Sequence, residues 1–143
     1  MSRLVEQIDV DAPIQTAWDG LHRVEAYPRF LEGVREARPE GETRARLSTD
    51  MGGRTKEIQA EITDRDQEHL MRWKTTSGPD MSGSFSLLPI DQEHTRVQAR
   101  VEYDPGTVKD TFGGPKGFAQ VQAMERLVRT DLEHFKQLVE EKR

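Results

Sequence analysis

The chain has no cysteine among its 143 residues, so disulfides, thiolate metal sites and a cysteine nucleophile are excluded. It also has no apolar run close to the roughly 18–20 residues that a membrane-spanning helix needs. Its first ten residues, MSRLVEQIDV, lack the apolar segment of a secretory signal peptide. We therefore expect a cytoplasmic protein, and the length is that of one domain over residues 1–143.

Positive charge is in deficit. Lys and Arg number 21 against 26 Asp and Glu, which gives a formal net charge of −5. Proteins that bind nucleic acid usually carry a basic face or stripe, so a nucleic-acid partner is not expected. The composition leaves the oligomeric state open.

Metal and nucleotide motifs are missing as well. The four histidines are scattered, and none forms an HxH or HExxH pattern, so no metal site is expected. The glycine-rich segment 113–117 lacks the GxxxxGK[ST] spacing that holds a nucleotide phosphate. We therefore expect no cofactor.

Apolar and polar residues alternate over much of the chain. The clearest run extends from Thr95 to Tyr103, and shorter runs cover 3–10, 34–39, 43–51, 56–63, 69–75 and 81–87. Turn signals such as Gly52-Gly53 separate these runs. Alternation with a period of two predicts an antiparallel sheet that has one buried face and one solvated face.

Helical spacing of apolar residues occurs in three places. It predicts two short helices, over 13–21 and around 27–31, and one long C-terminal helix from Phe118 to Val139 with a single apolar stripe. The sheet and the long helix must bury each other. The sequence therefore predicts an α+β fold: about seven antiparallel strands, two short helices after the first strand, and a long helix at the end.

Four segments also carry a family resemblance. The segment 8–18, IDVDAPIQTAW, is similar to an opening strand and first helix, and YPRFL at 27–31 to a second helix also found in coenzyme Q-binding proteins. The segments 73–97 and 131–138 are similar to the late strands and C-terminal helix of bacterial polyketide cyclase/dehydrase proteins. Together they resemble the helix-grip superfamily, which includes the START and Bet v 1 proteins.

The resemblance implies a curved sheet wrapped around the C-terminal helix, with a cavity between them for a hydrophobic or aromatic small molecule. The superfamily has no universal catalytic motif, so the resemblance leaves the activity open. The side chains expected to line the cavity are Met51, Met71, Trp73, Met81, Phe85, Tyr103, Val121, Met124 and Val128. Methionine is flexible and polarizable, which suits a surface that adapts to a ligand. The alternative is that these residues only fill the core, and periodicity does not separate the two interpretations.

Two inward-phase residues are candidate catalytic groups. Histidine is the residue type best suited to acid/base chemistry near neutral pH, so His69 is the natural acid/base candidate. Tyr103 has a hydroxyl that could meet a ligand, although a hydrogen bond within the protein is the simpler expectation. Glu6 is inward by parity but is expected to be solvated, because it lies near the start of a strand.

Three functions follow from these observations. The leading hypothesis is binding or transport of a hydrophobic small molecule, such as a lipid, a quinone or a polyketide-like compound. The second is an enzyme of the polyketide cyclase/dehydrase type that acts on a substrate in the same cavity. The third is an interaction module of the co-chaperone kind, which the charged outer faces do not support.

Overall fold

The structure is a computed structural model that describes residues 2–51, 54–106 and 118–141; the side chains of 50, 51, 54, 66 and 118–121 are outside that description. The strands are β1 (Ser2–Val10), β2 (Val34–Glu40), β3 (Arg44–Met51), β4 (Arg54–Arg65), β5 (Leu70–Ser77), β6 (Met81–Asp91) and β7 (His94–Tyr103). The helices are α1 (Ile14–His22), η1 (Val24–Ala26), α2 (Tyr27–Phe30), η2 (Asp66–Glu68) and α4 (Phe118–Glu140).

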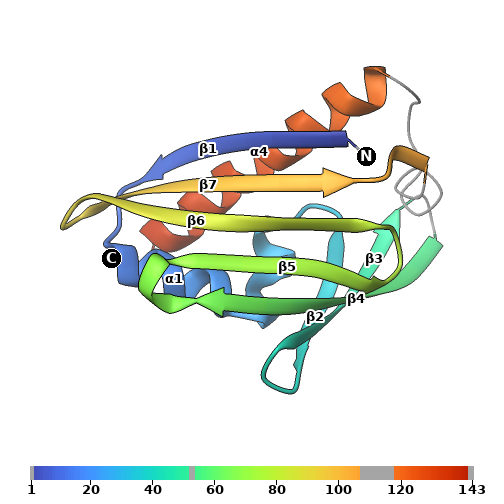
Figure 1. Cartoon of the computed structure of the whole chain (residues 1–143), viewed down its shortest axis with the longest axis horizontal. Coiled ribbons are helices and arrows are strands. Elements are labelled where there is room, and N and C mark those ends of the chain that lie inside the picture. Colours follow the sequence, from blue (N-terminus) through green and yellow to red (C-terminus); the bar gives the residue numbers. More distant parts are fainter. Residues whose placement is uncertain (1, 52–53, 107–117, 142–143) are drawn as a thin grey trace.

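The seven strands form one antiparallel sheet in the order β1-β7-β6-β5-β4-β3-β2. Strands β2 to β7 follow one another as a meander, and β1 pairs with the last strand of the series. Figure 1 shows α1, α2 and α4 on one side of the sheet, with α4 behind β1 and β7. We call this side the inner face. The predicted sheet, short helices and long C-terminal helix are confirmed.

The inner face is buried because one phase of each strand is apolar. On β7, the inward residues Val97, Ala99, Val101 and Tyr103 are buried, whereas Arg100 in the opposite phase is exposed. None of the described helices is both long and apolar enough to cross a membrane.

The main core lies where the C-terminal half of α4 meets α1 and α2. Phe135 of α4 is 1% exposed, and its ring meets that of Phe30 edge-on, with 5.2 Å between the ring centroids. Gly20 lets α1 approach α4, because a Cβ at this position would lie only 2.9 Å from Cγ1 of Val139. These contacts fix the C-terminal half of α4 against the rest of the fold.

Helix α2 is anchored from within. The Tyr27 hydroxyl donates to the carbonyl oxygen of Leu21 at 2.6 Å, and burial raises the pKa of Tyr27. Both Tyr27 and Phe30 are buried in the main core. Packing therefore accounts for these two aromatic residues.

Several strand boundaries differ from the expected runs, and the start of β5 is the one that affects a candidate catalytic residue. His69 was expected to begin the run 69–75, but β5 begins at Leu70. His69 instead follows η2 with a φ of 50°, in the left-handed region that a strand residue does not adopt. The predicted turn at Gly52-Gly53 lies outside the described residues.

Candidate ligand-binding site

A second, smaller hydrophobic cluster lies where β1 begins and β7 ends. Its buried members are Leu4, Val101, Tyr103 and Met124, and Trp73, Met81, Leu127 and Val128 pack against it while remaining partly exposed. The sheet register brings its members together, because Tyr103 pairs with Met81 and Leu4 with Val101. We call these eight residues the Tyr103 cluster.

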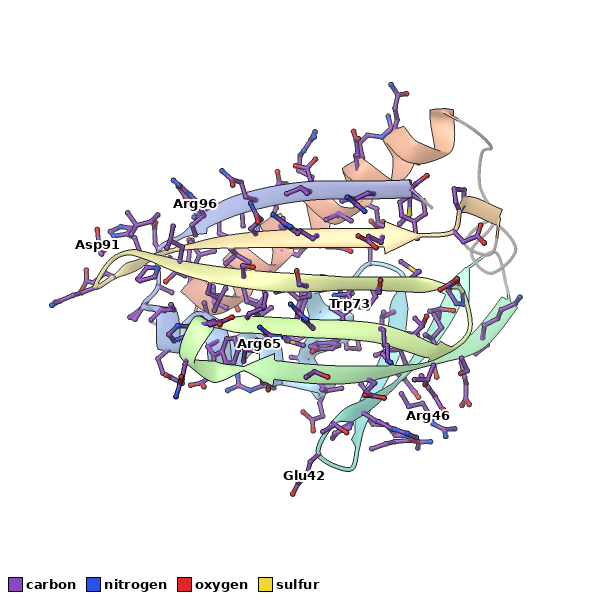
Figure 2. All side chains as sticks on the ribbon, viewed as in Figure 1. Glu42, Arg46, Arg65, Trp73, Asp91 and Arg96 are labelled. Atoms are coloured by element: carbon purple, nitrogen blue, oxygen red, sulfur yellow. The ribbon has the colours of Figure 1, made fainter. Side chains whose placement is uncertain are left out.

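Trp73 belongs to this cluster because Gly83 leaves room for its ring. The two residues pair across β5 and β6, and Figure 2 shows Trp73 near the middle of the sheet, beside β6. A Cβ at Gly83 would lie 2.8 Å from Cζ2 of Trp73 and 2.1 Å from the carbonyl oxygen of Arg100. The indole therefore occupies space that any side chain at position 83 would take.

Two polar atoms in the Tyr103 cluster have no partner. The Tyr103 hydroxyl and Nε1 of Trp73 are buried and make no hydrogen bond within the described part of the chain. Buried polar groups are nearly always hydrogen-bonded, and an unsatisfied one costs about 1–3 kcal/mol. Both groups can donate, and the indole N–H can only donate. The cluster therefore offers two donors that lack an acceptor.

The surroundings keep the Tyr103 hydroxyl protonated. Burial raises the pKa of Tyr103, and the negative charge of Glu125 on α4 raises it further. Ser2 lies opposite Tyr103 on β1, and its side chain lowers the pKa of Tyr103, against these two effects. It forms no hydrogen bond of normal geometry with the hydroxyl. At neutral pH Tyr103 is thus an uncharged donor.

The other expected lining residues divide between the two clusters. Met71 and Phe85 pack in the main core, and Val128 contacts both clusters. The side chains of Met51 and Val121 lie outside the described residues. Leu4 and Leu127 join the Tyr103 cluster although the sequence did not single them out. Leu4 is in the inward phase of β1, whereas Leu127 lies one position beside the apolar stripe of α4.

His69 does not share this site. Its backbone oxygen accepts a hydrogen bond from the amide of Leu87, and Leu87 pairs with Val97 on β7. Val97 is six residues before Tyr103, which corresponds to about 20 Å along the strand at the usual rise per residue. There the His69 ring meets Trp18 edge-on at 5.7 Å, and Trp18 also contacts His22. His69 and Tyr103 therefore do not act as one catalytic pair.

Glu6 corrects another expectation. It is not freely solvated: its side chain is only 18% exposed, and Oε1 accepts from Nη2 of Arg129 at 2.9 Å. This ion pair connects β1 to α4 next to the Tyr103 cluster.

Two surface pockets lie elsewhere. One of about 140 Å³ is lined by α2 and the end of α4, and one of about 410 Å³ by η1, α2 and strands β2 to β4. The larger pocket is lined mostly by charged side chains, among them Arg35, Arg46 and Glu57, and the smaller one includes Arg29 and Glu141. Within the described ranges, no group of three His, Asp or Glu residues is placed to hold a metal ion.

Asp131 on α4 has a strongly perturbed carboxyl group. Its Oδ1 accepts from the backbone amide of Glu32 at 3.1 Å. The pKa of Asp131 is raised to about 6, chiefly by burial and further by the charge of Glu32, against the opposing effects of that hydrogen bond and of His134. The folded state therefore favours the protonated acid.

We expect Asp131→Asn to stabilise the protein at neutral pH. Because the folded pKa lies above the unfolded one, the stabilising contribution of protonated Asp131 is complete below about pH 4 and is lost as the pH rises through 6. The side-chain oxygen of asparagine can accept the same hydrogen bond from the backbone amide of Glu32 without carrying a negative charge. Urea unfolding should show a difference in unfolding free energy near zero at pH 4 that grows to about 1 kcal/mol at pH 7.5, allowing for screening by solvent. A difference that does not vary with pH would contradict this expectation.

Comparison with known proteins identifies a matching family. The family model described as polyketide cyclase/dehydrase and lipid transport matches residues 1–140. An uncharacterized 17.2 kDa protein of Streptomyces lincolnensis is 30% identical, over 99% of this chain and 92% of the relative.

Solved structures show the same fold. The Zhui aromatase/cyclase from Streptomyces sp. R1128 matches with a TM-score of 0.77 at 18% identity, over 97% of this chain and 93% of that one. A START superfamily protein from Mycobacterium smegmatis matches with a TM-score of 0.75 at 14% identity, over 99% of both chains. The protein thus has the START-like helix-grip fold, and it belongs to the polyketide cyclase/dehydrase and lipid transport family.

Proposed function

We propose that the protein binds a hydrophobic small molecule between α4 and the inner face of the sheet, at the Tyr103 cluster. The observation that carries the proposal is the pair of unpartnered donors, the Tyr103 hydroxyl and Nε1 of Trp73, inside an otherwise apolar cluster. Ligand sites are mostly apolar and contain a few placed polar groups that orient the ligand. A ligand with an acceptor would satisfy what the protein leaves unsatisfied.

The flexibility of the neighbouring side chains supports this proposal. Met81 and Met124 flank Tyr103 from β6 and α4. Methionine changes rotamer readily and tolerates different contact shapes, so both side chains can move aside for a ligand. The family description, which names cyclases, dehydrases and lipid transport, is compatible with such a site.

Native mass spectrometry of the purified protein, followed by denaturing extraction, tests the proposal directly. We expect a co-purifying hydrophobic compound of defined mass, or, for an empty protein, saturable binding of the uncharged dye Nile red. A protein that carries nothing and does not bind Nile red would contradict the proposal.

A bulky residue at the junction of the two clusters should close the site. Val128 packs against both clusters and is partly exposed, so Val128→Trp should crowd the Tyr103 cluster and weaken Nile red binding at least tenfold. The matched control is Arg126→Trp, because Arg126 is exposed on the same helix. Circular dichroism identifies folded variants, and unchanged Nile red affinity in folded Val128→Trp would argue against this site.

An enzyme of the cyclase/dehydrase type is the second candidate function. The favouring observation is Tyr103, whose hydroxyl is protonated and unpartnered in an apolar environment, where it could polarise a ketone. In this case Tyr103→Phe should abolish turnover of a polyketide-like substrate and His69→Ala should not. Turnover that survives Tyr103→Phe would leave binding as the better account.

A further inference from the structure

The polar chemistry of the Tyr103 cluster limits the ligands that it can accept. This inference rests on the proposed function and concerns the polar end of the ligand. The two unpartnered groups are both donors, so the ligand should bring an oxygen acceptor. That requirement alone is met equally by a carbonyl group and by a carboxylate.

The charge next to the site separates these two possibilities. Glu125 directly follows Met124, a buried member of the cluster, on α4, and its negative charge raises the pKa of Tyr103. A ligand carboxylate bound to Tyr103 would therefore lie near another negative charge. A like charge in a poorly solvated site costs far more than it does in water.

The neighbouring cation is already engaged. Arg129 lies one helical turn after Glu125 and donates to Glu6 at 2.9 Å, so its charge is compensated by a partner on β1. A ligand carboxylate would have to share the Arg129 guanidinium with Glu6 to gain a counterion. Sharing it would weaken the pairing of the largely buried Glu6.

We propose that Glu125 and the Glu6–Arg129 pair make the site select ligands with an uncharged oxygen acceptor, such as a ketone, quinone or ester, and reject free carboxylates. Glu125 is the specificity-determining residue in this arrangement, and Tyr103 and Trp73 are the donors. Free fatty acids are excluded as ligands, whereas neutral carbonyl compounds of similar size are admitted.

Three naphthalene derivatives of matched size test the selection. They are 2-acetylnaphthalene, with a ketone, 2-naphthoate, with a carboxylate, and 2-isopropylnaphthalene, with no polar group. Each competes with Nile red at pH 7.5 for the full-length protein. We expect the ketone to bind most tightly and the carboxylate at least about tenfold more weakly than the ketone.

Two variants assign the preference to its causes. Tyr103→Phe removes a hydroxyl that has no partner, so the empty protein loses no hydrogen bond and should stay folded. It should weaken binding of the ketone about fivefold and leave the affinity for the hydrocarbon unchanged. Glu125→Gln should strengthen binding of 2-naphthoate several-fold without changing the affinity for the ketone. This result separates the effect of Glu125 from the general cost of burying any carboxylate.

The outcomes distinguish this inference from the proposed function. Equal affinities for the ketone and the carboxylate, together with Nile red binding, would overturn the selection and leave the binding site standing. A ratio of carboxylate to ketone affinity that stays the same in Glu125→Gln would also overturn it. Failure of Nile red and of all three derivatives to bind would instead overturn the proposed function.

Discussion

Gly83→Ala is expected to destabilise the protein by about 3 kcal/mol and to displace Trp73 from the Tyr103 cluster. The added Cβ would lie 2.1 Å from the carbonyl oxygen of Arg100 on β7 and 2.8 Å from Cζ2 of Trp73. The first contact involves backbone, which cannot move without disturbing the pairing of β6 and β7. Alanine is otherwise preferred over glycine inside a strand, so the loss would come from these two contacts.

Urea unfolding and tryptophan fluorescence measure the two effects. A Trp18→Phe background leaves Trp73 as the single tryptophan, so its emission reports on the cluster directly. Gly33→Ala is the matched control, since a Cβ at Gly33 meets no atom within 4 Å. Wild-type stability and unchanged Trp73 emission in Gly83→Ala would show that the indole does not depend on this glycine.

Phe135→Ala should cause the largest loss of stability, about 3–5 kcal/mol. Phe135 is 1% exposed, packs edge-on against Phe30, and lies close to Gly20 where α1 and α4 meet. Removing the ring leaves a cavity at the point where three helices converge. At roughly 3 °C per kcal/mol for a chain of this size, Tm should fall by about 10 °C.

The control for this substitution is Gln137→Ala, two positions further along α4 and exposed. It should change Tm by no more than about 1 °C. Because Phe135 belongs to the main core and not to the Tyr103 cluster, folded Phe135→Ala should retain Nile red binding. A loss of Tm as small as that of the control would contradict the packing described for α4.

The fold could be predicted because its main signals are local. Alternation along β7 follows directly from the order of residues such as Val97, Gln98 and Ala99, and the stripe of α4 follows from spacing within one segment. The alternation of residues gave a wrong prediction for His69, which precedes β5. His69 is two residues before Met71 and was therefore expected on the same face of the strand, but its left-handed backbone conformation places it outside the strand.

The candidate site could be predicted only in part because it depends on strand register. Met81 lies opposite Tyr103, and Gly83 lies opposite Trp73. These neighbours are known only once the pairing of the strands is known. The same holds for Glu6, whose partner Arg129 lies on the last helix. Composition therefore indicated the kinds of residue in the site, whereas long-range pairing determined which of them meet.

The pairing of the first strand with the last also governs when the site can form. Ser2 pairs with Tyr103, whereas β2 to β7 pair with sequence neighbours through short connections. Contacts between distant segments carry the highest loop-closure cost, so we expect the meander to assemble before β1 docks. During synthesis β1 emerges before β7. Leu4, Ile8 and Val10 therefore stay unburied until β7 has been synthesised and can pair with β1. A ligand of the Tyr103 cluster can therefore stabilise only the completed chain and cannot assist the early stages of its folding.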